Sequence, residues 1–139
     1  MDTRLIWWPA VAMVALTVVV WLRMYFSRVA QMKRERIHPQ AVATSAQAAA
    51  KLTDSKCADN FRNLFELPVL FYAAQLIAFS IHAADAIGLI LAWAFVALRL
   101  AHSAIQCGYN RVMHRFVAYA AGAAVLCALW VWLAWRLLD

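Results

Sequence analysis

Four long apolar stretches divide this chain, and they constrain its fold more than any other feature of the sequence. They cover residues 5–26, 61–81, 86–107 and 116–136. Each has about the 20 residues that an α-helix needs to cross a bilayer roughly 30 Å thick. The chain of 139 residues is 66% hydrophobic and only 14% charged, which excludes a water-soluble globular enzyme. We therefore predict an all-α integral membrane protein, a four-helix up-down bundle.

The connections between these stretches leave no room for a second domain, so we expect a single membrane domain over residues 1–139. No small-residue cleavage site follows the first stretch, which favours a retained span over a cleaved signal peptide. The inner loop, residues 27–60, is the longest polar segment. Its alanine-rich middle, residues 41–52, is compatible with a short surface helix. We interpret the loop as a solvated basic connector near anionic lipid headgroups rather than as a partner-binding element.

Lysine and arginine positions predict how the bundle is oriented, because cations accumulate on the cytoplasmic side of a membrane. The inner loop and residues 108–115 are rich in these cations, whereas residues 82–85 contain none. The sequence thus predicts both termini outside the cytoplasm and, in a bacterium, an inner-membrane location. Orientation accounts for the net charge of +6, so we expect membrane lipid as a partner and no nucleic acid. Tryptophans near the two termini would form an aromatic belt: Trp7, Trp8, Trp130, Trp132 and Trp135.

The cysteines Cys57, Cys107 and Cys127 are widely spaced and form no C-x-x-C pair, so the sequence predicts no disulfide framework and no metal site. We interpret them as small buried apolar side chains rather than reactive thiols. The sequence also contains no phosphate-binding glycine loop, nucleophile elbow or His-x-x-x-His pattern.

Polar side chains interrupt the second and third stretches at helical spacing. Those on the third stretch share one helix face at i, i+3, i+4, i+7 and i+11: Arg99, His102, Ser103, Gln106 and Asn110. On the second stretch a similar face carries Arg62, Asn63 and Glu66. Ionisable side chains inside a bilayer cost roughly 2.5–3.5 kcal/mol each on insertion scales, and they usually mark a site, a pathway or a partner.

Because the second and third spans run antiparallel, we expect Arg99 to neutralise Glu66, within one chain or across a subunit contact. Such a pair alone could serve helix packing. The same region carries more donors than one ion pair needs, including Asn63, His102, Gln106, Asn110, Arg111 and Arg115. The excess favours a polar cavity that opens to the cytoplasm and binds an anionic ligand. Arginines there would also favour the thiolate form of a bound thiol.

Two segments carry a likeness to a known family. Residues 59–72, DNFRNLFELPVLFY, resemble the second-helix signature of the MAPEG family, the membrane-associated proteins in eicosanoid and glutathione metabolism. The run from Arg99 to Arg115, with His102-Ser103, Gln106 and Tyr109-Asn110, resembles the second signature of its bacterial members. The order of four spans with a long inner first loop is similar over nearly the whole chain.

The resemblance implies a homotrimer of four-helix subunits that holds glutathione between neighbouring subunits on the cytoplasmic side. Asn63 and Glu66 match the asparagine and glutamate that contact the tripeptide in catalytic members. Arg99 and Tyr109 match third-helix residues of those members. The arginine that activates the thiol is matched by Arg111 or Arg115. The residues that we expect to bind glutathione are therefore Arg62, Asn63, Glu66, Arg99, Gln106, Tyr109 and Asn110.

The chain also departs from the pattern of catalytic eukaryotic members. Asp59 stands where those members usually carry an arginine, and His102, Ser103 and Gln106 replace a tyrosine-rich third helix.

The leading hypothesis is a membrane protein that binds glutathione or a similar thiol and acts on a lipophilic electrophile, as a transferase or peroxidase. Arg115 or Arg111 would stabilise the thiolate, and His102 would carry a proton or simply hold helices together. The alternative is a non-catalytic membrane scaffold or lipid-binding protein with the same fold. A small transporter is less favoured, because no pair of Gly- or Pro-broken helices is visible.

Overall fold

The computed structural model describes residues 3–138, and the regular structure among them is entirely helical. The elements in chain order are η1 (Thr3–Ile6), α1 (Trp7–Arg34), η2 (Pro39–Val42), α2 (Ser45–Lys51), α3 (Lys56–Asn63), α4 (Leu67–Ser80), α5 (Ala86–Cys107) and α6 (Val112–Leu138). Four helical segments are long and apolar enough to cross a membrane: Arg4–Arg34, Lys56–Ser80, Ala86–Cys107 and Val112–Leu138. The prediction of an all-α chain with four spans is confirmed.

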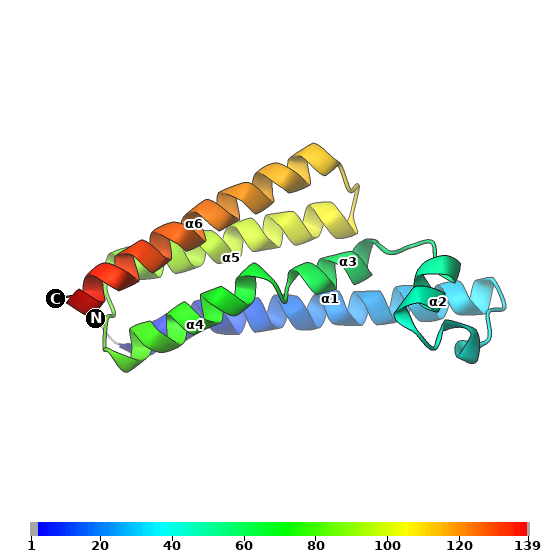
Figure 1. Ribbon diagram of the computed structural model, residues 1–139, viewed down its shortest axis with the longest axis horizontal. Helices are drawn as coiled ribbons and strands as arrows, with labels where there is room; N and C mark the ends of the chain where they lie inside the picture. The colour runs from blue at the N-terminus through cyan, green and yellow to red at the C-terminus, as the bar shows by residue number, and fades with distance from the viewer. Residues whose placement is uncertain (1–2, 139) are drawn as a thin grey trace.

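The helices form an elongated up-and-down bundle in which consecutive spans run in opposite directions (Figure 1). α6 packs mainly along α5, whereas α1 lies along α3 and α4. Both chain termini lie at one end of the bundle, which we call the terminal end. The opposite end carries α2 and the α5–α6 turn, and we call it the loop end.

Large apolar side chains fill the centre of the bundle. Met13 of α1, Phe71 of α4, Phe95 of α5 and Leu129 of α6 are each at most 1% exposed. The rings of Phe71 and Phe95 stack with their centroids 4.7 Å apart, which joins α4 to α5. Many other large apolar side chains lie on the outside of the bundle instead of in its core. A hydrophobic outer surface is expected where the surrounding solvent is lipid.

The second span is two helices rather than one. α3 ends at Asn63 and α4 begins at Leu67, with Glu66 in an irregular conformation (φ −98°, ψ −102°). Pro68 has no backbone N–H, so the carbonyl of Leu64, four residues earlier, has no helical donor. The backbone N–H of Leu64 still bonds to the carbonyl of Asn60, at 3.1 Å. The break therefore follows from Pro68, and it places Glu66 at the joint between the two helices.

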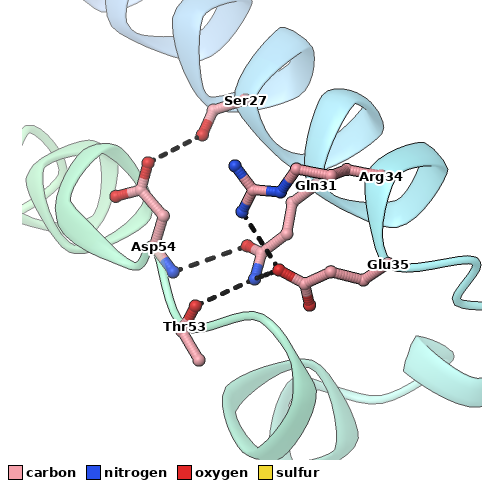
Figure 2. Close-up of polar contacts among 6 residues, drawn as sticks. All are labelled: Ser27, Gln31, Arg34, Glu35, Thr53 and Asp54. Atoms are coloured by element: carbon pink, nitrogen blue, oxygen red, sulfur yellow. Dashed lines mark hydrogen bonds and ion pairs between the residues drawn. The ribbon is translucent and has the colours of Figure 1, made fainter.

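The inner loop folds back against the end of α1. Gln31 is 5% exposed, and its amide donates to Thr53 Oγ1 at 2.9 Å and to Glu35 Oε1 at 3.0 Å (Figure 2). Ser27 Oγ donates to Asp54 Oδ2 at 3.1 Å in the same group of contacts. Hydrogen bonds from Arg34 and Gln31 lower the pKa of Glu35. These bonds fix the start and end of the loop next to each other.

Between those points, the alanine-rich segment forms the expected short surface helix. Thr44 and Gln47 form a capping box at the start of α2: the Thr44 hydroxyl accepts from the Gln47 backbone, and the Gln47 side chain accepts from the Thr44 backbone. No residue of α2 is buried. The helix is thus stabilised locally and lies on the surface.

At the terminal end, Asp85 connects α5 to α6. Its side chain caps α5 by accepting the Gly88 backbone N–H at 2.8 Å, and it also accepts from the Trp132 indole at 3.2 Å and pairs with Arg136. Burial opposes ionisation of Asp85, but the bonds from Gly88, Arg136 and Trp132 outweigh it and lower the pKa of the carboxyl. Both carboxylate oxygens of Asp85 therefore accept hydrogen bonds.

Candidate functional site

Polar side chains of α3 and α5 face one another and form hydrogen bonds across the bundle. Asn63 Nδ2 donates to Gln106 Oε1 at 3.1 Å. One turn away, Asn60 accepts from the Ser103 hydroxyl at 3.3 Å and donates to Cys107 Sγ at 3.5 Å. Asn60 is fully buried, and Ser103 and Gln106 are 3% and 2% exposed. The predicted polar faces of the second and third spans thus meet, and Asn63 and Gln106 are in contact.

Arg99 lies deeper along the same face of α5 and is buried among aromatic rings. Its side chain is 1% exposed, and its guanidinium carbon lies 5.3 Å from the Phe95 ring centroid and 5.0 Å from that of Tyr119. Cation–π contacts of this kind stabilise a desolvated cation by about 2 kcal/mol. None of the three guanidinium nitrogens has a hydrogen-bond partner among residues 3–138. Arg99 is therefore a buried cation whose donors are unmet within one subunit.

His102 shares this environment. It is 2% exposed, its ring centroid lies 5.9 Å from that of Tyr119, and its Nδ1 atom has no hydrogen-bond partner among the described residues. Because Arg99 and His102 are only 1% and 2% exposed, neither side chain lines an open cavity among residues 3–138. The expected cavity is therefore not open at this depth within one chain, and a cavity between subunits that opens to the cytoplasm stays a prediction.

The expected ion pair between Arg99 and Glu66 is not formed within the subunit. Glu66 is exposed at the helix break, while the Arg99 nitrogens are buried and without a partner among residues 3–138. The two groups remain close enough to attract one another electrostatically. The break caused by Pro68 explains the difference, because it removes Glu66 from the regular helix on which the depth argument depended. A contact across subunits stays a prediction.

The turn between α5 and α6 positions Arg115. Asn110 adopts a positive φ of 51°, a conformation that asparagine tolerates better than most residues. Its side chain accepts from Arg115 Nη1 at 3.0 Å. Tyr109 is exposed, and its hydroxyl lies 2.9 Å from His114 Nδ1. The turn therefore orients the half-buried Arg115 side chain at the loop end of the bundle.

The remaining predicted site residues lie apart from this buried group. Arg62 pairs with Asp59 at 3.8 Å on the surface, where both side chains are largely exposed. Arg111 is also exposed. With Glu66 and Tyr109, they form a set of exposed polar residues around the buried polar face. The structure thus divides the predicted residues into a buried group on α3 and α5 and an exposed group at the surface.

Sequence reasoning missed two residues of the site, Asn60 and Tyr119. Asn60 lies three residues before Asn63, a spacing that puts it on the same helix face and was readable from the sequence. Tyr119 lies four residues after Arg115 in the last span, where an aromatic residue gives no signal of its own. Among residues 3–138 no cluster of three or more His, Cys, Asp or Glu side chains suited to a metal ion is found.

The arrangement combines cations and amides on the loop-end half of the bundle. Arg99 and Arg115 supply charge for an anion, and Asn60, Asn63 and Gln106 supply amide donors and acceptors. The fold and this site define a class: a polytopic helical membrane protein with a cationic polar region inside one half of its bundle.

Comparison with known families identifies the class more closely. The model of the MAPEG family matches residues 6–135, which is nearly the whole chain. The chain belongs to the MAPEG family. No curated protein and no solved structure matches the chain in the corresponding searches.

Proposed function

We propose that this protein binds glutathione, or a similar anionic thiol, between subunits of a homotrimer. It would transfer the thiol to a lipophilic electrophile that arrives through the bilayer, or reduce that electrophile. The observation that carries the proposal is the Arg99 side chain, which is 1% exposed and has no hydrogen-bond partner for any of its three nitrogens among residues 3–138. A buried cation without an anion costs several kcal/mol, so an anion from outside the subunit is favoured.

Membership of the MAPEG family supports glutathione as the ligand, because the family typically binds this tripeptide. In the proposed complex Asn63 and Glu66 bind amide and amine groups of the ligand, while Arg99 and Arg115 offset its negative charge. Exposed residues at the loop end, including Arg62 and Tyr109, would lie at the subunit contact. The proposed orientation in the membrane places the loop end of the bundle in the cytoplasm and both termini outside it.

Arg115 is the better candidate for the thiolate-stabilising residue than Arg111. Asn110 holds Arg115 at 3.0 Å, and that bond uses only one nitrogen of a group with five N–H donors. Arg111 is exposed and precedes α6. A positioned arginine stabilises a charge more effectively than a solvated one, because it does not reorganise when the charge develops. His102, with its unpartnered Nδ1, is the proposed proton carrier.

Binding of glutathione to the purified protein in detergent tests the proposal. We expect binding at millimolar glutathione and an ultraviolet absorbance from the bound thiolate. Arg115→Ala should raise the pKa of the bound thiol by about one unit, so that the pH at which the thiolate absorbance appears rises by the same amount, while Arg111→Ala, the matched control, should leave it unchanged. Intact trimers that bind no glutathione would favour the alternative, a non-catalytic scaffold or lipid-binding protein with this fold.

A further inference from the structure

Two cysteines come together at the loop end of the bundle, where α3 and α5 pack. Cys57 on α3 and Cys107 at the end of α5 are 50 positions apart in the sequence, but the packing of α3 against α5 brings them to the same end of the bundle. The pair continues the polar face described above, because Asn60, one turn after Cys57, donates to Cys107 Sγ at 3.5 Å. Both thiols are reduced. The interpretation of the three cysteines as buried side chains is confirmed for Cys57, whereas Cys107 is partly exposed and Cys127 is exposed.

The surroundings of the pair differ from those of an inert apolar core. Arg23 of α1 donates to the Cys107 carbonyl at 3.1 Å, which places a cation at the end of α5. A nearby guanidinium favours a thiolate, the form of cysteine that attacks disulfides. Three helices thus bring two thiols, an amide and a cation to one place.

The two thiols differ in how accessible they are. Cys57 is 8% exposed, whereas Cys107 is partly exposed beside the α5–α6 turn. An external reagent would meet Cys107 first, and Cys57 would be reached only through its neighbour. This order, an accessible thiol with a resolving thiol behind it, is typical of redox-sensitive cysteine pairs. The third cysteine, Cys127, is exposed on α6 and does not lie on the polar face of α3 and α5.

We propose that Cys57 and Cys107 form a reversible disulfide that ties α3 to α5. The oxidant is a low-molecular-weight disulfide such as glutathione disulfide. The Cys107 thiolate attacks one sulfur of the oxidant and releases one glutathione thiolate, which takes up the proton lost by Cys107. The Cys57 thiolate then attacks Cys107 Sγ of the mixed disulfide and releases the second glutathione, which takes up the Cys57 proton. Two thiols are oxidised and one disulfide is reduced to two thiols.

The link would act on the region around the polar face. α3 is separated from α4 by the break at residues 64–66, so its position depends on its contacts with α1 and α5. Cys107 directly follows Gln106, which binds Asn63 of α3. A disulfide between Cys57 and Cys107 therefore fixes α3 against α5 next to that bond. The inference stands on the cysteine geometry and does not depend on the proposed function.

Thiol counting on the purified full-length protein in detergent tests the proposal. The protein is treated with glutathione disulfide, quenched with acid, denatured and alkylated, and the peptides are mapped by mass spectrometry. Wild type should lose two of its three thiols and give a peptide that joins Cys57 to Cys107. Dithiothreitol should restore all three. The control Cys127→Ser should form the same link.

The single variants separate the two steps. Cys57→Ser should accumulate glutathione on Cys107, and Cys107→Ser should form no link. Oxidised wild type should also show a higher melting temperature in detergent than reduced wild type. Wild type that keeps three thiols at saturating oxidant, or that links Cys127 or joins two subunits instead, would overturn the proposal. The wild-type peptide map gives this answer even if a serine variant does not fold.

Discussion

The two ends of the bundle differ in how completely their buried polar side chains are hydrogen-bonded. At the terminal end, Asp85 accepts from Gly88, Trp132 and Arg136 and joins α5 to α6. In the loop-end half, Arg99 and His102 are buried, yet four of their nitrogen atoms have no hydrogen-bond partner among residues 3–138. Satisfied buried groups specify a structure, whereas unsatisfied ones cost free energy and persist where a function or a partner requires them. The terminal end therefore satisfies its buried polar groups within the chain, whereas the loop-end half leaves donors unmet among residues 3–138, which is where we propose that a ligand binds.

The largest effect is expected from Gly88→Ala at the terminal end. A Cβ atom on Gly88 would lie 2.5 Å from the Trp132 ring, so the ring must move and its bond to Asp85 is strained. Overpacking of this kind lowers the free energy of unfolding by about 3 kcal/mol, measured by reversible unfolding in detergent. Gly122→Ala is the control, because its Cβ would meet nothing closer than 3.8 Å. Equal losses in the two variants would contradict the role of this contact.

Arg99→Met probes the opposite half. Replacing a buried charge that has no partner with an apolar side chain of similar length should raise the free energy of unfolding by about 2 kcal/mol. The same change should weaken glutathione binding at least about tenfold, which corresponds to roughly 1.4 kcal/mol. Arg111→Met, at an exposed position, is the control. A loss of stability in Arg99→Met would mean that Arg99 already has an anionic partner in the assembled protein.

Trp132→Phe tests the hydrogen bond between Trp132 and Asp85 at the terminal end. The substitution keeps an aromatic ring near Gly88 but removes the indole N–H that donates to Asp85 at 3.2 Å. We expect a loss of about 1 kcal/mol in the free energy of unfolding, the usual net value of one hydrogen bond. Trp135→Phe on the exposed side of α6 should change it little. If the two variants are equally stable, Asp85 does not depend on Trp132.

The smallest expected effect is a fall in stability at acid pH that originates at the Asp85 carboxyl. The pKa of this carboxyl is lower in the folded protein than in the unfolded chain, so its ionised form stabilises the fold. The contribution is complete above the unfolded pKa near 4 and is lost as the pH falls through the folded pKa. Asp85→Asn should flatten the dependence of melting temperature on pH in this window. An unchanged profile would place the acid sensitivity elsewhere.

The fold was predictable from the sequence because lipid imposes a simple requirement. A span must satisfy its backbone hydrogen bonds internally, so about 20 apolar residues indicate a helix almost regardless of its neighbours. The position of Pro68 was visible, but sequence patterns do not indicate how far a proline will break a helix. The break matters because it moves Glu66 out of the register that would have brought it to Arg99.

The site was predictable only in part. Helical spacing predicted one polar face on the second span, with Asn63, and another on the third span, with Gln106. These two faces do meet between α3 and α5. Spacing within one helix does not reveal which residue of another helix lies opposite. For that reason the sequence did not predict the Tyr119 ring over Arg99 or the hydrogen bond between Asn60 and Cys107.

The amino-acid sequence by itself determined that the chain crosses the membrane four times and that polar faces lie on the second and third spans. It did so because hydrophobic length and helical periodicity are properties of local chain segments. The packed bundle was needed to show which polar atoms are paired and which buried cation has no hydrogen-bond partner among residues 3–138. Those outcomes depend on the rotation and axial position of each helix against its neighbours, which are set by the packing of the whole bundle.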